Sequence, residues 1–203
     1  MNKEPIIIVA GEPNSVFFEI FFKSIKINRY KSPLIIIGSK ELLEKQMLKL
    51  GFFYKINTID KNFNNFKKLN NKMINLINVK YKFKNCFEDI STKSNNYIEE
   101  TFDVALKIII QNNFSKLING PISKKHFLKG KTLGITEYLA KKTKKNNNIA
   151  MLIFNKKLSV SPITTHLALK DVHKHISKKK YILRLSLLLS FIKKILRKNQ
   201  KLQ

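Results

Sequence analysis

Short apolar runs alternate with amphipathic segments through the first part of the chain. Residues 5–10 and 33–37 have the length and the β-branched composition of buried strands. A polar turn follows each run, and residues 15–25 and 40–50 then carry apolar side chains at helical spacing. Ser39 is well placed to cap the second of these helices. This order predicts an α/β fold, which we expect to be a three-layer sandwich of a mixed sheet and helices.

The middle of the chain extends the same pattern. Residues 52–59 and 74–79 are strand candidates, and the Asn- and Lys-rich segment between them, residues 60–72, is expected to be a solvated loop. In residues 96–112 the apolar positions recur at intervals of four, three and four, which is typical of a helix with one buried face.

The rest of the chain predicts shorter elements. Residues 117–121 read as a short strand running into a turn, and short helices are expected over residues 123–128 and 134–142. Two apolar runs, residues 148–154 and 158–164, are joined by a polar tripeptide and are therefore expected to form a β-hairpin.

His166 follows this hairpin, at the end of a predicted buried strand, where open α/β sheets usually bind ligands. Its imidazole can serve as a metal ligand, a general base or a structural side chain, and the pattern by itself leaves these roles open. His173 and His175 lie among lysines and are expected to form an exposed polar turn rather than a metal site. Neither a G-x-G-x-x-G motif nor a Walker A lysine is present, so no common nucleotide-binding motif can be assigned.

Residues 181–197 predict a helix whose polar residues occupy only a narrow side. A helix that is apolar over most of its surface needs to be covered on more than one side, so we expect the isolated chain to expose hydrophobic surface. Charges within this segment leave too few consecutive apolar residues for a membrane span.

The chain is strongly basic, with 40 Lys+Arg against 13 Asp+Glu and a formal net charge of +27. The lysines are interleaved with Asn and Ile almost everywhere instead of being gathered in one segment, so we expect no specific nucleic-acid binding. The alternative is a non-catalytic basic scaffold protein that binds polyanions. Cys86 is the single cysteine, and no signal-peptide pattern is present, so a cytoplasmic location is expected.

Four segments, taken in order, resemble the 4-hydroxythreonine-4-phosphate dehydrogenases of vitamin B6 synthesis. They are residues 6–13 (IIIVAGEP, with Glu19 after it), residues 119–124 (NGPISK), residues 134–140 (GITEYLA) and residues 164–171 (TTHLALKD). A single segment would be a weak signal, but the last three at these mutual spacings are specific. The resemblance covers essentially the whole chain.

The resemblance implies an NAD-dependent or NADP-dependent dehydrogenase that oxidises the secondary alcohol of 4-phosphohydroxy-L-threonine. The product then loses carbon dioxide to give 3-amino-2-oxopropyl phosphate, on the route to pyridoxine 5'-phosphate. A divalent metal such as zinc, magnesium or cobalt would stabilise the alkoxide, and NAD would accept the hydride. The family is also expected to form homodimers and to fold as two α/β domains around a cleft, without a membrane partner.

Individual residues follow from the matched segments. His166 matches a metal-ligating histidine, and Thr136 matches a threonine that contacts the substrate. Lys124 lies in the Gly-Pro-Ile turn and is a weak candidate for an electrostatic role. Ile135 stands where the family has a histidine, so substrate recognition at this position must differ.

Family members continue for about a further domain, which contains two more metal-ligating histidines. We therefore expect residues 1–203 to be the N-terminal portion of a two-domain dehydrogenase whose second part is missing after Gln203. One imidazole does not make a metal site, because a zinc site takes about three protein ligands. We accordingly expect little activity from this chain by itself.

Overall fold

The computed structural model describes residues 3–63, 65–145, 148–155 and 157–200. The chain forms two compact units, Met1–Lys129 and Gly130–Gln203, and each is described by itself. Within the described residues, no helix is long and apolar enough to cross a membrane.

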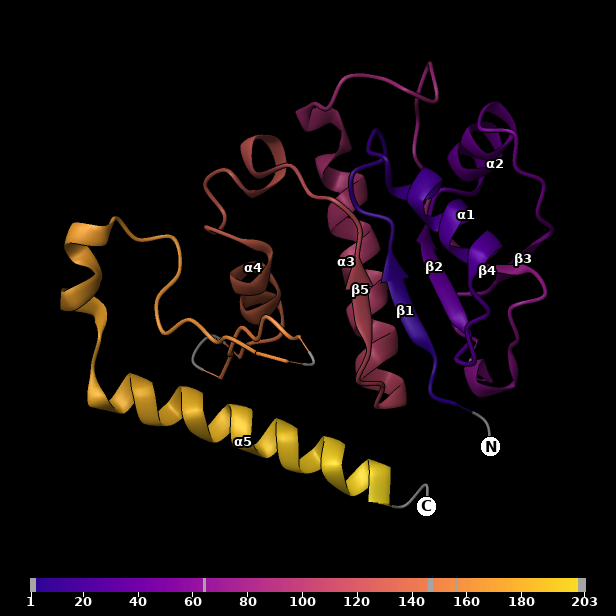
Figure 1. The fold of residues 1–203 in the computed structure, drawn as a ribbon. Helices are drawn as coiled ribbons and strands as arrows, with labels where there is room; N and C mark the ends of the chain where they lie inside the picture. The colour runs from indigo at the N-terminus through magenta and orange to yellow at the C-terminus, as the bar shows by residue number, and fades with distance from the viewer. Residues whose placement is uncertain (1–2, 64, 146–147, 156, 201–203) are drawn as a thin grey trace. The chain divides into compact units, whose positions relative to one another are not determined.

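The first unit is built on a five-stranded sheet (Figure 1). Its strands are β1 (Ile6–Val9), β2 (Leu34–Gly38), β3 (Ile56–Ile59), β4 (Ile74–Asn78) and β5 (Leu117–Asn119), in the order β3-β4-β2-β1-β5. All four strand pairs are parallel, so the α/β class is confirmed but the expected mixed sheet is wrong. The antiparallel bridge between Ile153 and Val160 lies in the second unit, outside the sheet.

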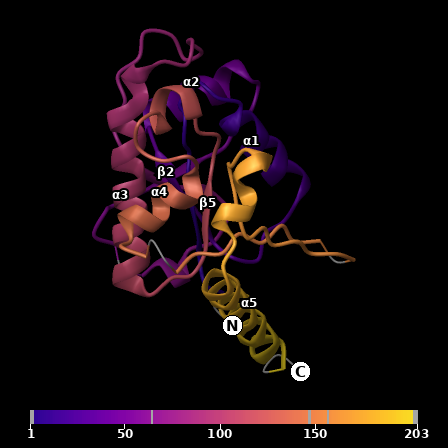
Figure 2. The same ribbon diagram turned by 90° about the vertical axis from the view of Figure 1, so that its left-hand side faces the viewer.

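Helices cover both faces of the sheet. The helices α1 (Phe17–Ile27) and α2 (Lys40–Lys49) pack on one face, and α3 (Asn95–Asn112) packs on the other, so the three layers are confirmed (Figure 2). Because successive strand residues point to opposite faces, Ile8 and Ile36 face the α1 and α2 side. Both faces of a parallel sheet are buried in this way, which explains why its strands read as continuous apolar runs.

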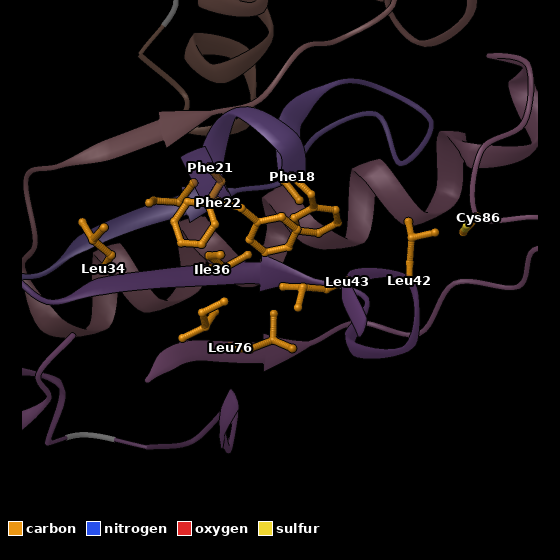
Figure 3. Close-up of a cluster of buried hydrophobic side chains, with 12 residues drawn as sticks. Phe18, Phe21, Phe22, Leu34, Ile36, Leu42, Leu43, Leu76 and Cys86 are labelled. Atoms are coloured by element: carbon orange, nitrogen blue, oxygen red, sulfur yellow. The ribbon is translucent and has the colours of Figure 1, made fainter. Parts of the chain in front are cut away.

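The core under α1 and α2 is rich in phenylalanine. Phe18, Phe21 and Phe22 project from α1 onto Ile36 and Leu76 of the sheet (Figure 3). Phe22 is fully buried, and burying such a side chain stabilises a fold by about 1.5–3 kcal/mol. The predicted helices of this unit are confirmed, including the Ser39 cap, whose Oγ accepts a hydrogen bond from the Leu42 N–H at 3.3 Å.

The strand predicted for residues 52–59 is too long at its start. Only Ile56–Ile59 pair with β4, although Phe52 and Tyr54 already pack against Phe22, with ring centroids 5.3 Å and 6.1 Å away. The alternation of buried side chains therefore begins before the backbone reaches a partner strand. Phe66, in the loop predicted for residues 60–72, is buried rather than solvated.

The second unit contains α4 (Ile135–Lys142), a 3₁₀ segment (Leu169–His175) and α5 (Lys178–Gln200). The predicted hairpin over residues 148–164 is wrong in its extent. Ile153 and Val160 form a single antiparallel bridge, and Lys156 of the connecting tripeptide lies outside the described residues. Both bridge residues are more than half exposed, so this segment lacks the apolar packing that extends a pair of strands.

Two turns meet backbone to backbone at the carboxyl edge of the sheet. The Gly120 N–H donates to the Val9 carbonyl at 2.8 Å, and the Glu12 N–H donates to the Pro121 carbonyl at 2.9 Å. A Cβ atom on Gly120 would lie 2.1 Å from the Ala10 carbonyl oxygen, so only glycine fits this position. The turn after β1 is thereby held against the turn after β5.

Glu12 is buried beneath this contact, with 2% of its surface exposed. Its Oε2 accepts a hydrogen bond from Ser94 Oγ at 3.0 Å, whereas its Oε1 has no hydrogen-bond partner among the described residues. Burial raises the pKa of this carboxyl, and Ser94, the Asn14 amide and His126 partly offset the rise. Ionisation of Glu12 therefore destabilises the folded state relative to the unfolded chain.

We expect Glu12→Gln to stabilise the protein at neutral pH. Because the folded-state pKa lies above 4.5, the stability linked to protonation is complete below that pH and is lost as the pH rises through the folded-state pKa. Glutamine cannot ionise and can still accept a hydrogen bond from Ser94, so Glu12→Gln should raise the free energy of unfolding at neutral pH. Denaturant unfolding between about pH 4 and pH 8, followed by circular dichroism, measures this difference.

Glu88→Gln provides a control of opposite sign. The Asn85 and Lys84 backbone N–H groups donate to its Oε1, each at 2.8 Å, and lower its pKa. The ionised Glu88 carboxylate therefore stabilises the folded state above the ordinary pKa of glutamate, and this stabilisation is lost as the pH falls. Glu88→Gln should therefore destabilise the protein at neutral pH, and equal responses of the two variants would contradict the assigned cause.

The apolar surface predicted for the last helix is present. Tyr181, Leu185, Leu189 and Ile192 recur at intervals of four, four and three along one side of α5, and each is between 43% and 52% exposed. An exposed apolar stripe of this kind favours association.

The purified chain should bind a hydrophobic dye and self-associate. The double substitution Leu185→Gln, Leu189→Gln should weaken self-association by about tenfold or more. The reason is that each leucine buried on association contributes about 1.5–3 kcal/mol. Sedimentation velocity measures the self-association of the chain and of each variant. Leu48→Gln is the matched control, because Leu48 is 67% exposed on α2, a helix of the first unit. A chain that stays monomeric without dye binding would show that the stripe does not mediate association.

Candidate functional site

His166 occupies an exposed turn rather than the tip of a buried strand. Residues 158–164 form no strand beyond the bridge at Val160, and Pro162 has no N–H with which to continue a ladder. The His166 backbone is left-handed, with φ of 58°. Such a conformation is uncommon for a residue other than glycine and is concentrated at functional sites.

Gly134, the residue before α4, lets two side chains approach each other. A Cβ atom at this position would lie 2.7 Å from Glu137 Oε2 and 3.1 Å from His166 Nε2. The carboxylate and the imidazole are therefore at most about 6 Å apart, and both depend on the missing side chain at Gly134. Any larger residue would push one of them away.

Thr165 fixes the carboxylate in this arrangement. Its Oγ1 donates a hydrogen bond to Glu137 Oε1 at 3.3 Å, which ties the turn before His166 to the first turn of α4. The two segments 134–140 and 164–171, about 30 residues apart in sequence, thus meet in one place. An acidic group and an imidazole in this arrangement can bind a cation or exchange a proton.

The other predicted residues are divided between the two units. Thr136 and Ile135 lie in the first turn of α4 and are partly buried. Lys124 is exposed in a single helical turn of the first unit, Lys124–Leu128. Sequence reasoning assigned no role to Glu137, although an acid in the first turn of a helix, inside a matched segment, was the available signal.

The described residues do not complete a metal centre. They contain no group of three or more His, Cys, Asp and Glu side chains that could hold a metal ion. His166 and Glu137 supply two groups with suitable donor atoms, whereas a zinc site takes about three protein ligands. His173 and His175 are exposed in their 3₁₀ segment, as the sequence predicted.

Comparison with known proteins gives these segments a context. The family model described as pyridoxal phosphate biosynthetic protein PdxA matches residues 29–202. The 4-hydroxythreonine-4-phosphate dehydrogenase of Sulfurihydrogenibium sp. (strain YO3AOP1) is 32% identical over 184 residues, which cover 89% of this chain and 55% of the relative. That of Wigglesworthia glossinidia brevipalpis is 29% identical over 182 residues, covering 87% and 53%. The chain spans about half the length of these curated relatives.

Solved structures share the fold. A putative 4-hydroxythreonine-4-phosphate dehydrogenase from Salmonella typhimurium superimposes with a TM-score of 0.76 at 18% identity, over 94% of this chain and 60% of that one. The enzyme of the same name from Klebsiella pneumoniae gives a TM-score of 0.78 at 17% identity, over 94% and 58%.

The family match rests on sequence and the fold match on structure, and the two agree. The family model covers most of the chain, including both segments that meet at Gly134. The chain therefore belongs to the PdxA family, the 4-hydroxythreonine-4-phosphate dehydrogenases of pyridoxal phosphate biosynthesis.

Proposed function

We propose that this chain takes part in the NAD-dependent, divalent-metal-dependent oxidation and decarboxylation of 4-phosphohydroxy-L-threonine to 3-amino-2-oxopropyl phosphate. NADP is the alternative hydride acceptor. In this proposal His166 is one metal ligand and Thr136 contacts the substrate. Family membership supports the reaction class, and the observation that carries the proposal is the convergence of His166 and Glu137 at Gly134.

The proposal makes the chain a contributor to the site rather than the whole of it. Because the described residues lack a group of three metal ligands, the remaining ligands must come from outside them. A homodimer is one source of such groups. Cofactor binding is assigned to no residue of this chain.

Ile135 changes the substrate contact that the family resemblance implies. Its side chain cannot donate a hydrogen bond or carry a charge, and it is partly buried next to Thr136 at the start of α4. We therefore assign the polar contact at this end of α4 to Thr136 and Glu137. Glu137 keeps its orientation through Thr165.

Fragment complementation tests the proposal. The purified chain, given NAD, 4-phosphohydroxy-L-threonine and zinc or magnesium, should turn over far more slowly than the roughly 10 per second typical of enzymes. Adding the separately produced part of the Sulfurihydrogenibium dehydrogenase that the match leaves uncovered should raise the rate of NAD reduction by at least about tenfold. Circular dichroism establishes first that the added part is folded.

His166→Ala should abolish the gain, whereas His173→Ala should leave it unchanged, because His173 is exposed and lies outside the Gly134 site. Turnover of about 1 per second or more by the chain alone would disprove the partial-site proposal. Complementation that survives His166→Ala would remove His166 from the metal site.

A further inference from the structure

A pocket lies in the first unit, at the amino edge of the sheet. Its volume is about 450 Å³, within the range of roughly 300–1,000 Å³ typical of small-molecule sites. Leu34 and Ile74, the first residues of β2 and β4, both line it. The turns that carry Glu12 and Gly120 follow the carboxyl ends of β1 and β5, so the pocket lies at the opposite edge. It belongs to the first unit alone and shares no residue with the Gly134 site.

Aromatic rings form much of the apolar wall of this pocket. Phe21 contributes from α1 and lies with Leu34 at one end of the phenylalanine-rich core (Figure 3). Phe21 packs on Phe22, and Phe22 stacks on Tyr54, with ring centroids 6.0 Å and 6.1 Å apart. Tyr54 also lines the pocket, so its ring is held in place by a fully buried neighbour. Tyr30 lines the pocket and is 39% exposed, which leaves its ring accessible to a ligand.

Asparagine side chains hold the rim of the pocket together. Asn71 Oδ1 accepts a hydrogen bond from the Leu34 N–H at 2.8 Å, and Asn71 Nδ2 donates to the Tyr30 carbonyl at 2.9 Å. The buried Asn75 donates from Nδ2 to the Leu34 carbonyl at 3.2 Å. These bonds join the segment before β2 to the segment before β4. The pocket is therefore built into the fold, and the amides that frame it are already hydrogen-bonded.

The charged residues of the lining are Arg29 and Lys72, and both are cations. Neither forms an ion pair in the part of the chain that the structure describes. Within the same residues, no acidic side chain lines the pocket. Two unpaired cations beside an aromatic wall are complementary to an anion with an apolar body.

The general excess of lysine accounts for Lys72 but not for the rest of this lining. The chain has three arginines among its 40 basic residues, and one of them, Arg29, lies here. Aromatic residues make up 10% of the chain, yet three of them line this one pocket. A surface that was merely basic would not combine an arginine with a group of accessible rings.

We propose that this pocket binds a small aromatic carboxylate. The ring of the ligand lies among Phe21, Tyr30 and Tyr54, and its carboxylate pairs with Arg29 and Lys72. A guanidinium group presents a planar fork that matches the two oxygens of a carboxylate, so Arg29 provides the directed contact. The site needs neither a metal nor NAD. It is separate from the proposed dehydrogenase reaction, because it uses none of the residues assigned to that reaction.

Calorimetric titration of the full chain with three probes tests both parts of the pocket. Indole-3-acetate carries a ring and a carboxylate, tryptophol replaces the carboxylate by an alcohol, and acetate lacks the ring. Indole-3-acetate should bind at least about tenfold more tightly than tryptophol, because only its carboxylate forms charge-assisted hydrogen bonds. An equal concentration of acetate should not displace it. Because the chain contains no tryptophan, the anisotropy of indole fluorescence checks independently that the probe is bound.

Substitutions then assign each part. Arg29→Gln should weaken indole-3-acetate binding by about tenfold and leave tryptophol binding unchanged, because it removes only the carboxylate contact. Tyr30→Leu should weaken the binding of both probes, because it removes a ring from the wall. Lys31→Gln is the matched control, since it removes one positive charge from the same loop and Lys31 does not line the pocket. Thermal unfolding of each variant establishes that its fold is intact.

Four results would overturn the proposal. They are the absence of indole-3-acetate binding at about 10 mM, equal affinity for tryptophol, displacement by an equal concentration of acetate, and equal weakening by Arg29→Gln and Lys31→Gln. The last two would indicate general attraction of anions to a basic chain. The titration contains no metal or NAD, so its failure is separate from failure of the complementation assay.

Discussion

The close approach of two turns at the carboxyl edge of the sheet is the contact on which the first unit depends. Gly120 must lack a side chain because the backbone of the turn after β1 passes where a Cβ atom would be. The hydrogen bonds from Gly120 to Val9 and from Glu12 to Pro121 join segments more than 100 residues apart. They place β5 beside β1, which completes the sheet, and α3 packs against β1 and β2.

The same contact has an electrostatic consequence. Glu12 is buried there with Ser94 as its hydrogen-bond donor and His126 as an electrostatic neighbour. Asn95 Oδ1 and His126 Nδ1 also lack hydrogen-bond partners among the described residues. Burying a carboxyl group whose oxygen has no hydrogen-bond partner lowers the stability of the fold. The close packing of the two turns must therefore offset this loss. The phenylalanine core under α1 and the apolar strands supply the opposing stabilisation.

The parts of the fold that the sequence predicted well are those in which local pattern and packing agree. Helix α3 buries Ile98, Phe102 and Ala105, as its spacing indicated, whereas Ile109 is only partly buried. The strands β1, β2 and β4 form where their apolar runs predicted them. The prediction of a hairpin after residue 148 was wrong in its extent. The spacing and composition of apolar residues do not reveal whether a second apolar surface packs against them. Ile153 and Val160 are more than half exposed in the described structure. In the site, the matched segments identified His166, but the space at Gly134 and the role of Glu137 depend on a tertiary contact that no spacing encodes.

The two units differ in how their polar groups are held, and this difference bears on function. Glu12 is fixed by a closed core, and its surroundings leave it little room to meet a ligand. Glu137 is held by one hydrogen bond beside an exposed, left-handed His166. The candidate metal-binding and substrate-binding groups of this chain thus lie in the second unit, the first unit is an α/β framework, and the family model matches residues of both units.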